Sequence, residues 1–233
     1  MPTLFRKFKL CSNRRSVGSV LLLLAVFVAA QSHAAEEAKS NFVDIKSLDP
    51  SIVIELRYAG THNPLHRRLY PATMRALLQP NVAKQLVGAQ NFLLHYKYGL
   101  KIWDAYRPKS VQRQLWQFVH DESYVTNPED GVGSLHTWGV AVDATLVDAR
   151  GQSVLMPSDF DEFTPAAMLH YHGMDSLIGS HLRLLQTAMG HNRFYGLHTE
   201  WWHFISYDWK NYVPSREAQM TEQASKTEPS GKL

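Results

Sequence analysis

The sequence predicts a single α+β domain in which a small mixed or antiparallel sheet is flanked by helices. Helical and strand-like periodicities are mixed along the chain rather than strictly alternating, which favours this class over a doubly wound parallel sheet. The 233 residues contain no internal repeat and no linker long enough to separate two domains. We therefore expect one domain at residues 43–213, a length that can bury enough apolar surface to be stable.

The first 34 residues are typical of a secretory signal peptide. Basic residues without any acidic one precede an apolar run at residues 17–30, and Ser32 to Ala34 offers small residues for cleavage. The alternative is an uncleaved N-terminal anchor, although the apolar run is short for a membrane span. Cys11 precedes this run, so it is not a lipid-attachment cysteine. We expect residues 1–34 to be removed and the protein to be periplasmic or secreted, with no membrane association afterwards.

Cleavage would change both the charge and the cysteine content. Residues 1–34 hold five of the 24 Lys and Arg and none of the 21 Asp and Glu, so the remaining chain is slightly acidic. The basic isoelectric point is therefore no argument for nucleic-acid binding. Loss of Cys11 removes the only cysteine, which excludes disulfides, thiolate metal ligands and a cysteine nucleophile.

Periodicity predicts the elements of the domain in chain order. Apolar residues alternate as in a strand at residues 52–56 and 100–102, and they recur at helical spacing in three other segments. The expected helices are Asn81 to Tyr98 with Gly99 as its stop, residues 109–120, and a helix from Leu177 ended by Gly190. The last residues, 214–233, are polar without an aromatic residue and are expected to be a disordered tail.

A further strand is predicted in GVAVDATLV, residues 139–147. A period of two places Val140, Val142, Ala144 and Leu146 on one apolar face, which should pack on the core. Asp143 falls on the other face between the small side chains of Ala141 and Thr145, which leaves room above it for an ion and a substrate.

Two motifs carry candidate metal chemistry: SLHTWGVAVDAT, residues 134–145, and EWWH, residues 200–203. Together they supply two imidazoles and one carboxylate to hold a metal, with one carboxylate left over. Three protein ligands and an open position are typical of catalytic zinc, and a spare Glu is the usual base for water. Glu200 and His203 have an odd separation, so they converge only if a turn or bulge interrupts their strand.

These motifs resemble the zinc D,D-peptidases of bacterial cell-wall metabolism. S-x-H-x-x-G-x-A-x-D followed by E-x-W-H is shared with that group, and three features resemble its VanX-type D-Ala-D-Ala dipeptidase branch. They are WDAYRP (residues 103–108), MPSDFDEF (residues 156–163) and the second Trp of EWWH. The segment at residues 57–70 is similar to the branch's RYAT-x-x-NF but has Gly60 for Thr and Pro64 for Phe.

The resemblance implies roles for seven residues. The metal ligands would be His136, Asp143 and His203, which would hold one zinc per chain, and Glu200 would be the catalytic base. Arg107 would face the oxyanion, while Ser134 and Asp161 would contact the substrate. General chemistry agrees, because a free dipeptide is a zwitterion that needs an anion near its ammonium group and a hydrogen-bond donor near its carboxylate.

Each assignment has a plainer alternative. Arg107 could simply pair with Asp104 at a turn, and Ser134 could only cap a turn. Asp161 belongs to an acidic cluster with Asp159 and Glu162 that could be a solvated loop. His170, His172, His191 and His198 show no ligand spacing, and Trp201 and Trp202 are expected to be partly core.

The expected function is zinc-dependent hydrolysis of D-Ala-D-Ala or a close D,D-dipeptide. One alternative is a D,D- or L,D-carboxypeptidase that trims peptidoglycan stem peptides, which needs a cleft open on the amino side of the scissile bond. Another is a non-catalytic, zinc-stabilised wall-binding module, but such a module needs neither Glu200 nor Arg107. The sequence leaves the oligomeric state and the physiological purpose open.

Overall fold

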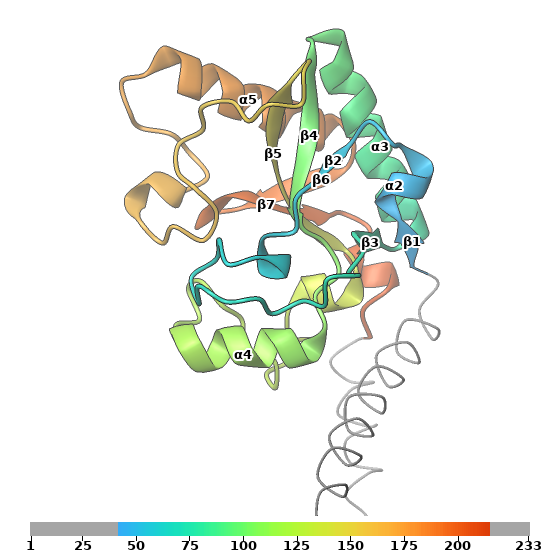
Figure 1. The fold of residues 1–233 in the computed structure, drawn as a ribbon, viewed down its shortest axis with the longest axis vertical. Helices are drawn as coiled ribbons and strands as arrows, with labels where there is room; N and C mark the ends of the chain where they lie inside the picture. Colours follow the sequence, from blue (N-terminus) through green and yellow to red (C-terminus); the bar gives the residue numbers. More distant parts are fainter. Residues whose placement is uncertain (1–41, 215–233) are drawn as a thin grey trace, which may run out of the picture. The chain divides into compact units, whose positions relative to one another are not determined.

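A five-stranded mixed sheet organises residues 42–214, the part of the chain that the computed structural model describes (Figure 1). β2 runs parallel to β4, whereas every other neighbouring pair is antiparallel. In spatial order the strands are β2 (Val53–Ile54), β4 (Tyr98–Asp104), β5 (Ala141–Asp148), β7 (Glu200–Ser206) and β6 (Phe194–Leu197). A separate antiparallel pair joins β1 (Val43–Asp44) to β3 (Leu77–Leu78). The predicted α+β class with a mixed sheet is confirmed.

Helices accompany the sheet on both sides. The α-helices are α2 (Ile45–Leu48), α3 (Pro80–His95), α4 (Lys109–Val119) and α5 (Ser176–His191). Short 3-10 helices are η1 (Arg57–Ala59), η2 (Leu135–Trp138), η3 (Pro165–Ala167) and η4 (Trp209–Asn211). α3 and α5 pack against each other and the sheet, and α4 lies on the opposite side (Figure 1). Because α3 and α5 cover the other face, a functional site can form on the sheet face turned toward α4.

The two faces of β5 divide as predicted. Val142, Ala144 and Leu146 are completely buried and join the hydrophobic core together with side chains of α3 and α5. Asp143 and Thr145 point to the other face and are also buried. An apolar face thus anchors the strand, while the alternate face presents a carboxylate.

The predicted end of the first long helix is wrong. α3 ends at His95, Lys97 adopts a left-handed φ of 63°, and Tyr98 already begins β4. Gly99 is part of that strand, where a Cβ would lie 3.2 Å from the Gln90 side-chain nitrogen. Gln90 in turn accepts a hydrogen bond of 2.7 Å from the Leu100 backbone. Strand pairing with β5 therefore decides the boundary, and Gly99 serves a close approach rather than a helix stop.

The other two predicted helices are present with small changes at their ends. α4 ends at Val119 because His120 takes a left-handed conformation with φ 47°. α5 begins after Asp175, whose side chain accepts hydrogen bonds from the first turn, and it continues through Gly190 to His191. Gly190 is therefore inside the helix and not its stop.

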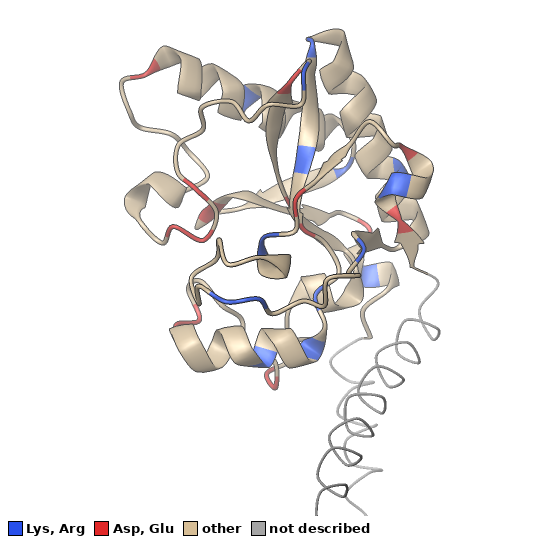
Figure 2. Ribbon diagram, viewed as in Figure 1, with Lys and Arg blue, Asp and Glu red and all other residues tan. Residues whose placement is uncertain are grey.

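The terminal segments lie outside the described residues. These are the predicted signal peptide, residues 1–34, and all of the predicted tail after Pro214. Within residues 42–214, no helix combines the length and the apolar character that crossing a membrane requires. Basic and acidic residues are interspersed along this part of the ribbon rather than gathered on one side (Figure 2).

Gly139 provides a test of how the fold aims η2 at the sheet. It follows η2 with φ +65°, and a Cβ there would lie 2.7 Å from the Phe42 ring. We expect Gly139→Ala to lower the free energy of unfolding by about 2–4 kcal/mol, since left-handed strain and overpacking add. Gly131→Ala is the matched control, because Gly131 has φ +51° but no atom near its Cβ position. Urea unfolding measures both variants, and equal losses would contradict the predicted clash with Phe42.

Candidate active site

A row of three polar side chains crosses the sheet on the face toward α4. Asp104 of β4 and His203 of β7 are both paired directly with Asp143 of β5. Directly paired residues on neighbouring strands share a face, so the three side chains meet. Asp104 reaches this row through a register shift between Ile102 and Asp104. Regular pairing would place Asp104 opposite Val142, on the apolar face.

His136 joins the row from η2, the 3-10 helix that precedes β5. Its Nδ1 lies 2.7 Å from the carbonyl oxygen of Ala105, which can only accept a hydrogen bond. Nδ1 must therefore carry the proton, and Nε2 keeps a free lone pair. Nε2 faces His203 Nδ1 at 3.1 Å. A histidine held this way is prepared to bind a metal.

The donor atoms of His136, Asp143 and His203 have the spacing that a tetrahedral metal requires. Asp143 Oδ1 lies 3.0 Å from His203 Nδ1, and Asp143 Oδ2 lies 3.4 Å from His136 Nε2. Ligands at 2.0–2.1 Å from a tetrahedral zinc are about 3.3 Å apart. One ligand atom from each of the three residues can be chosen so that all three atoms lie within 4.8 Å of one another. The predicted ligand set is thus brought together, and its chemistry fits zinc.

The protonation states of this cluster also suit a cation. Burial lowers the pKa of His203, so its imidazole is neutral and can donate a lone pair. Burial alone would raise the pKa of Asp143, but the imidazoles of His136 and His203 hold it well below its usual value. Asp143 is therefore a carboxylate, the form in which it binds metal.

Glu200 is the spare carboxylate beside the donor cluster. A register irregularity between Gly196 and Leu197 interrupts the pairing of β6 with β7, which confirms the predicted break in EWWH. Glu200 Oε2 consequently lies 3.7 Å from His203 Nδ1. Burial, together with the charges of Asp143 and Asp161, raises the pKa of Glu200 well above its usual value. Such a shift makes a carboxylate a better proton acceptor.

The tryptophans between Glu200 and His203 belong to the core. Trp201 and Trp202 are both completely buried, as expected. They fix the backbone of the motif while the polar residues at its two ends turn toward the site.

Arg107 pairs with Asp104, and it also belongs to the site. Its Nε donates to Asp104 Oδ2 at 2.7 Å, and Nη1 donates to Gln112 at 2.9 Å. Nη2 lies 3.4 Å from Asp143 Oδ2, and the side chain lines the pocket. The plainer reading of Arg107 is therefore correct but incomplete, because the same ion pair fixes a cation beside the donor cluster.

Ser134 and Asp161 both line the pocket. Ser134 is buried at the start of η2 but makes no capping hydrogen bond with its side chain, so the alternative of a simple turn cap is wrong. Asp161 is partly buried and accepts a 2.7 Å hydrogen bond from Tyr58, so it is not a solvated loop residue. Burial raises the pKa of Asp161 to about 7, against the hydrogen bond from Tyr58 and the charge of Arg107.

The structure separates Asp161 from its acidic neighbours. Asp159 forms ion pairs with Arg57 and His62, and Glu162 is exposed. Only Asp161 of this cluster faces the pocket.

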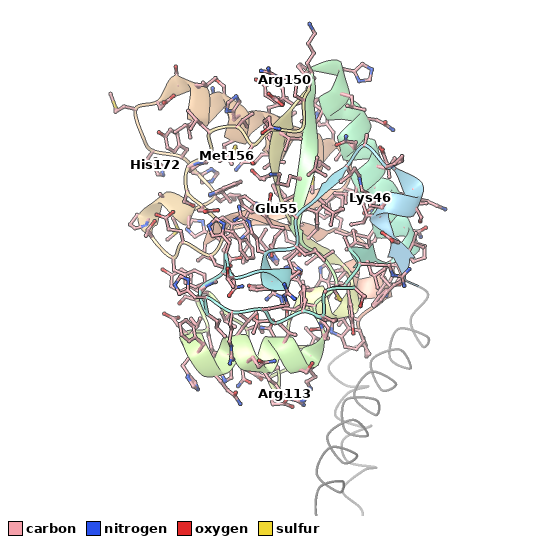
Figure 3. The ribbon with its side chains drawn as sticks, in the orientation of Figure 1. Lys46, Glu55, Arg113, Arg150, Met156 and His172 are labelled. Carbon is pink, nitrogen blue, oxygen red and sulfur yellow. The ribbon has the colours of Figure 1, made fainter. Side chains whose placement is uncertain are left out.

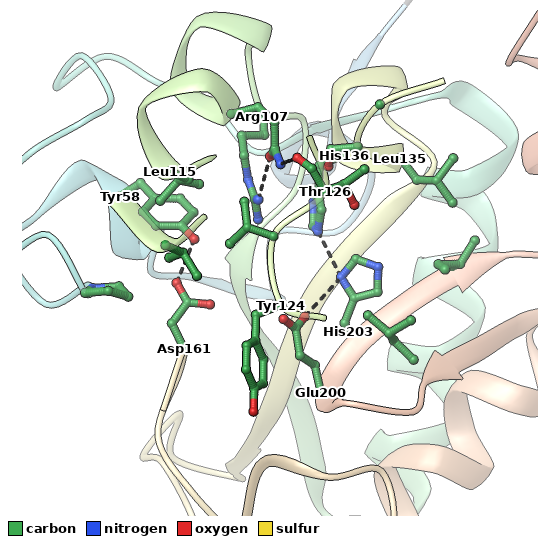
Figure 4. Close-up of a pocket in the computed structure, with 18 of the residues that line it drawn as sticks. Tyr58, Arg107, Leu115, Tyr124, Thr126, Leu135, His136, Asp161, Glu200 and His203 are labelled. Atoms are coloured by element: carbon green, nitrogen blue, oxygen red, sulfur yellow. Dashed lines mark hydrogen bonds and ion pairs between the residues drawn. The ribbon is translucent and has the colours of Figure 1, made fainter. Parts of the chain in front are cut away.

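The pocket has a volume of about 300 Å³ and lies between α4, β7 and three loops. Figure 4 shows Glu200 and His203 on one side and Asp161 with Tyr58 on another, with Arg107 and His136 above. This volume is at the small end of ligand pockets, as expected for a small substrate. The sequence candidates that line it are Arg107, Ser134, His136, Asp161, Glu200 and His203. Asp143 does not line the pocket, but it contacts His136 and His203, which do.

Four further residues of this pocket make contacts that the sequence motifs do not indicate. Tyr58 holds Asp161, Gln112 holds Arg107, and the rings of Tyr124 and Phe163 meet with centroids 4.6 Å apart. Tyr58 and Phe163 lie inside segments that resemble the family, so their presence in those motifs was the available signal. Gln112 and Tyr124 carry no sequence signal, since both contacts are made only in the folded chain.

The α+β fold and the His-Asp-His cluster with a neighbouring Glu together define a metal-dependent hydrolase. Residues 38–221 match the peptidase M15 family of D-Ala-D-Ala dipeptidases. The chain belongs to this family, and it is a zinc metallopeptidase.

Two relatives that are named D-alanyl-D-alanine dipeptidases agree with this assignment. A D-alanyl-D-alanine dipeptidase of Escherichia coli (strain K12) is 32% identical over 165 residues, which cover 71% of this chain and 84% of that protein. The D-alanyl-D-alanine dipeptidase of Enterococcus faecium is 28% identical over 144 residues, covering 54% of this chain and 71% of that protein. Among solved structures, VanYB in complex with D-Alanine-D-Alanine superposes with a TM-score of 0.38 at 15% identity, covering 68% of this chain and 93% of that chain.

Removing one donor should cost the protein its metal. We expect His203→Ala to lose most bound zinc, because Asp143 and His136 alone are too few ligands for tight binding. His172→Ala is the control, since His172 is an exposed residue before α5 (Figure 3) and is not one of the three candidate ligands. Metal analysis after dialysis against a weak chelator measures both. Wild-type zinc affinity in His203→Ala would exclude His203 as a ligand.

Proposed function

We propose that this protein is a zinc-dependent D,D-dipeptidase that hydrolyses D-Ala-D-Ala or a close relative in cell-wall peptide metabolism. In this proposal His136, Asp143 and His203 hold one zinc ion per chain. The observation that carries it is a small pocket with the donor cluster and Glu200 on one side and the carboxylate of Asp161 on another. Family membership and the names of the relatives support the same substrate class.

Zinc held at this cluster would polarise the scissile carbonyl and lower the pKa of a coordinated water to about 7. Glu200 takes a proton from the attacking water as its oxygen adds to the carbonyl carbon. The same carboxylic acid returns that proton to the amine when the C–N bond breaks, so two amino acids leave and Glu200 is ionised again.

Arg107 stabilises the negative charge that develops on the carbonyl oxygen. Its contacts with Asp104, Gln112 and Asp143 fix the guanidinium before substrate arrives. A donor that needs no reorganisation typically stabilises an oxyanion by about 3–4 kcal/mol. Ser134 can donate its hydroxyl to the substrate carboxylate, and Asp161 can accept hydrogen bonds from the substrate ammonium group.

The ring contact of Tyr124 with Phe163 favours a dipeptidase over a carboxypeptidase. Phe163 follows Asp161 closely in the chain, and both rings line the pocket. A stem peptide would have to extend past Asp161 on this side, where the two rings now meet.

The proposed location of the protein is the periplasm or the extracellular space, because residues 1–34 are typical of a secretory signal peptide.

Replacing the base should separate catalysis from metal binding. We expect Glu200→Gln to retain zinc and to lower kcat about 10²–10⁴-fold, since the base is removed while the ligands remain. Zinc content and steady-state kinetics on D-Ala-D-Ala measure the two effects. Loss of zinc in this variant would instead make Glu200 a ligand.

The proposed substrate is tested by blocking its amino group. We expect zinc-loaded protein to hydrolyse D-Ala-D-Ala but neither L-Ala-L-Ala nor a stem pentapeptide. N-acetyl-D-Ala-D-Ala should lose about 10²-fold or more in kcat/KM, because acetylation leaves Asp161 without its cationic partner. Asp161→Asn should reduce this difference, because it should lower kcat/KM for the free dipeptide more than for the acetylated one.

Acidity offers a second readout of the same contact. Ionised Asp161 binds the ammonium group, and its pKa is raised to about 7, so KM for the free dipeptide should rise as the pH falls through this range. Bound zinc would lower the pKa of Asp161, so in the zinc-loaded protein this rise in KM should occur at a lower pH. KM for the acetylated dipeptide should not rise in this way, because that substrate has no ammonium group. Equal hydrolysis of the free and acetylated substrates would refute the dipeptidase and support the carboxypeptidase.

A further inference from the structure

Asp161 holds an unfavourable backbone conformation at the edge of the pocket. Its φ is +53°, in the left-handed region that residues with a Cβ adopt at a cost of about 1 kcal/mol or more. A strained residue in a loop keeps its conformation only when its surroundings hold it. The hydrogen bond from Tyr58 holds the carboxylate itself, and the contacts on the N-terminal side of Asp161 hold its backbone in this conformation.

Those contacts converge on Arg57, a residue in η1 whose side chain is only 9% exposed. Arg57 Nη2 donates to Asp159 Oδ1 at 3.1 Å, and Nη1 contacts His62. His62 Nε2 lies 2.8 Å from the second oxygen of Asp159, so both oxygens of this carboxylate are held. Asp159 Oδ1 also accepts a 2.7 Å hydrogen bond from the backbone of Phe160.

Glu55 holds the other side of the guanidinium. Its Oε1 lies 3.2 Å from Arg57 Nε, and its Oε2 accepts a 2.7 Å hydrogen bond from Lys101 of β4. Glu55 follows β2, the edge strand of the sheet, and its backbone N–H donates to the carbonyl oxygen of Ile102 in β4 at 2.9 Å (Figure 3). An isolated ion pair with a partner as exposed as Asp159 would contribute little to stability. The Arg57–Asp159 pair, however, belongs to a network that is anchored on the sheet.

Arg57 also supports the loop through aromatic packing. Its guanidinium lies over the Trp103 ring at 4.9 Å, and the Trp103 ring contacts Phe160 with centroids 5.6 Å apart. Phe160 is buried and stands between Asp159 and Asp161. One side chain therefore supports both residues that immediately precede Asp161.

We propose that Arg57 is a positioning residue for substrate specificity: by binding Asp159 and supporting Phe160 through Trp103, it fixes Asp161 where the substrate ammonium group is received. This role rests on the proposed dipeptidase function. Arg57 does not line the pocket itself, so it acts only through the loop. Releasing the loop should weaken recognition of the ammonium group and leave the zinc site unchanged.

The test compares zinc-loaded wild type with Asp159→Asn, Asp161→Asn and the double variant, on free and N-acetylated D-Ala-D-Ala. Asp159→Asn is a mild change because Asp159 is partly exposed. We expect it to raise KM for the free dipeptide about tenfold, the scale of one charge-assisted hydrogen bond, with kcat and zinc content unchanged. KM for the acetylated dipeptide should stay within about twofold, because that substrate makes no ionic contact with Asp161.

The double variant distinguishes positioning from general damage. If Asp159 acts through Asp161, adding Asp159→Asn to Asp161→Asn should cause no further loss. Arg57→Lys should retain more activity on the free dipeptide than Arg57→Gln, since it keeps a cation for Asp159. Asp148→Asn is the matched control, an acidic residue paired with exposed Arg150 at the far end of β5.

Two results would overturn the inference while leaving the proposed function intact. One is an equal loss on free and acetylated substrates, and the other is an additive loss in the double variant. A wild type that cleaves both substrates equally well would instead remove the proposed function itself, and the role of Arg57 with it.

Discussion

The site depends on a buried carboxylate that cannot be left without a cation. Asp143 is 2% exposed and Asp104 is completely buried, while Glu200 and Asp161 stand at the same pocket. The Arg107 guanidinium forms ion pairs with both Asp143 and Asp104. Several carboxylates around one guanidinium are stable only if some are protonated or a further cation is bound. Burial is the main cause of the raised pKa values of Glu200 and Asp161, and the charges of neighbouring carboxylates add to it. A divalent ion at the His-Asp-His cluster would relieve that repulsion.

Two register irregularities make that concentration of charge possible. The shift between Ile102 and Asp104 brings Asp104 to the face of Asp143, and the one opposite Gly196 and Leu197 brings Glu200 toward His203. In regular strands Asp104 would fall on the apolar face, and Glu200 and His203 would point to opposite faces. The remaining pairs keep ordinary register, so the core is formed by one face while the other is reserved for chemistry.

The sequence was a good guide where function depends on residue type and short spacing. The two imidazoles and two carboxylates of the metal motifs were visible, and the odd separation of Glu200 and His203 required the break that the structure contains. The end of α3 was not predictable locally, because residues 96–98 fit a helix as well as a strand until β5 pairs with β4. Tyr58 lies 103 residues from Asp161, and no periodicity reveals such a contact. Roles that arise from tertiary contacts, such as those of Gln112 and Tyr124, need the fold.

The two ends of the pocket are held by different kinds of structure, and this separates catalysis from recognition. His203, Asp143 and Asp104 are locked by the hydrogen-bonded ladder of three strands, so moving one of them means breaking the sheet. Asp161 is held by side-chain contacts and carries backbone strain, so modest energies can move it. If Asp161 receives the substrate ammonium group as proposed, changes in the loop should alter substrate recognition and leave the His-Asp-His cluster in place. A pocket built this way can keep its hydrolytic chemistry while its substrate range changes.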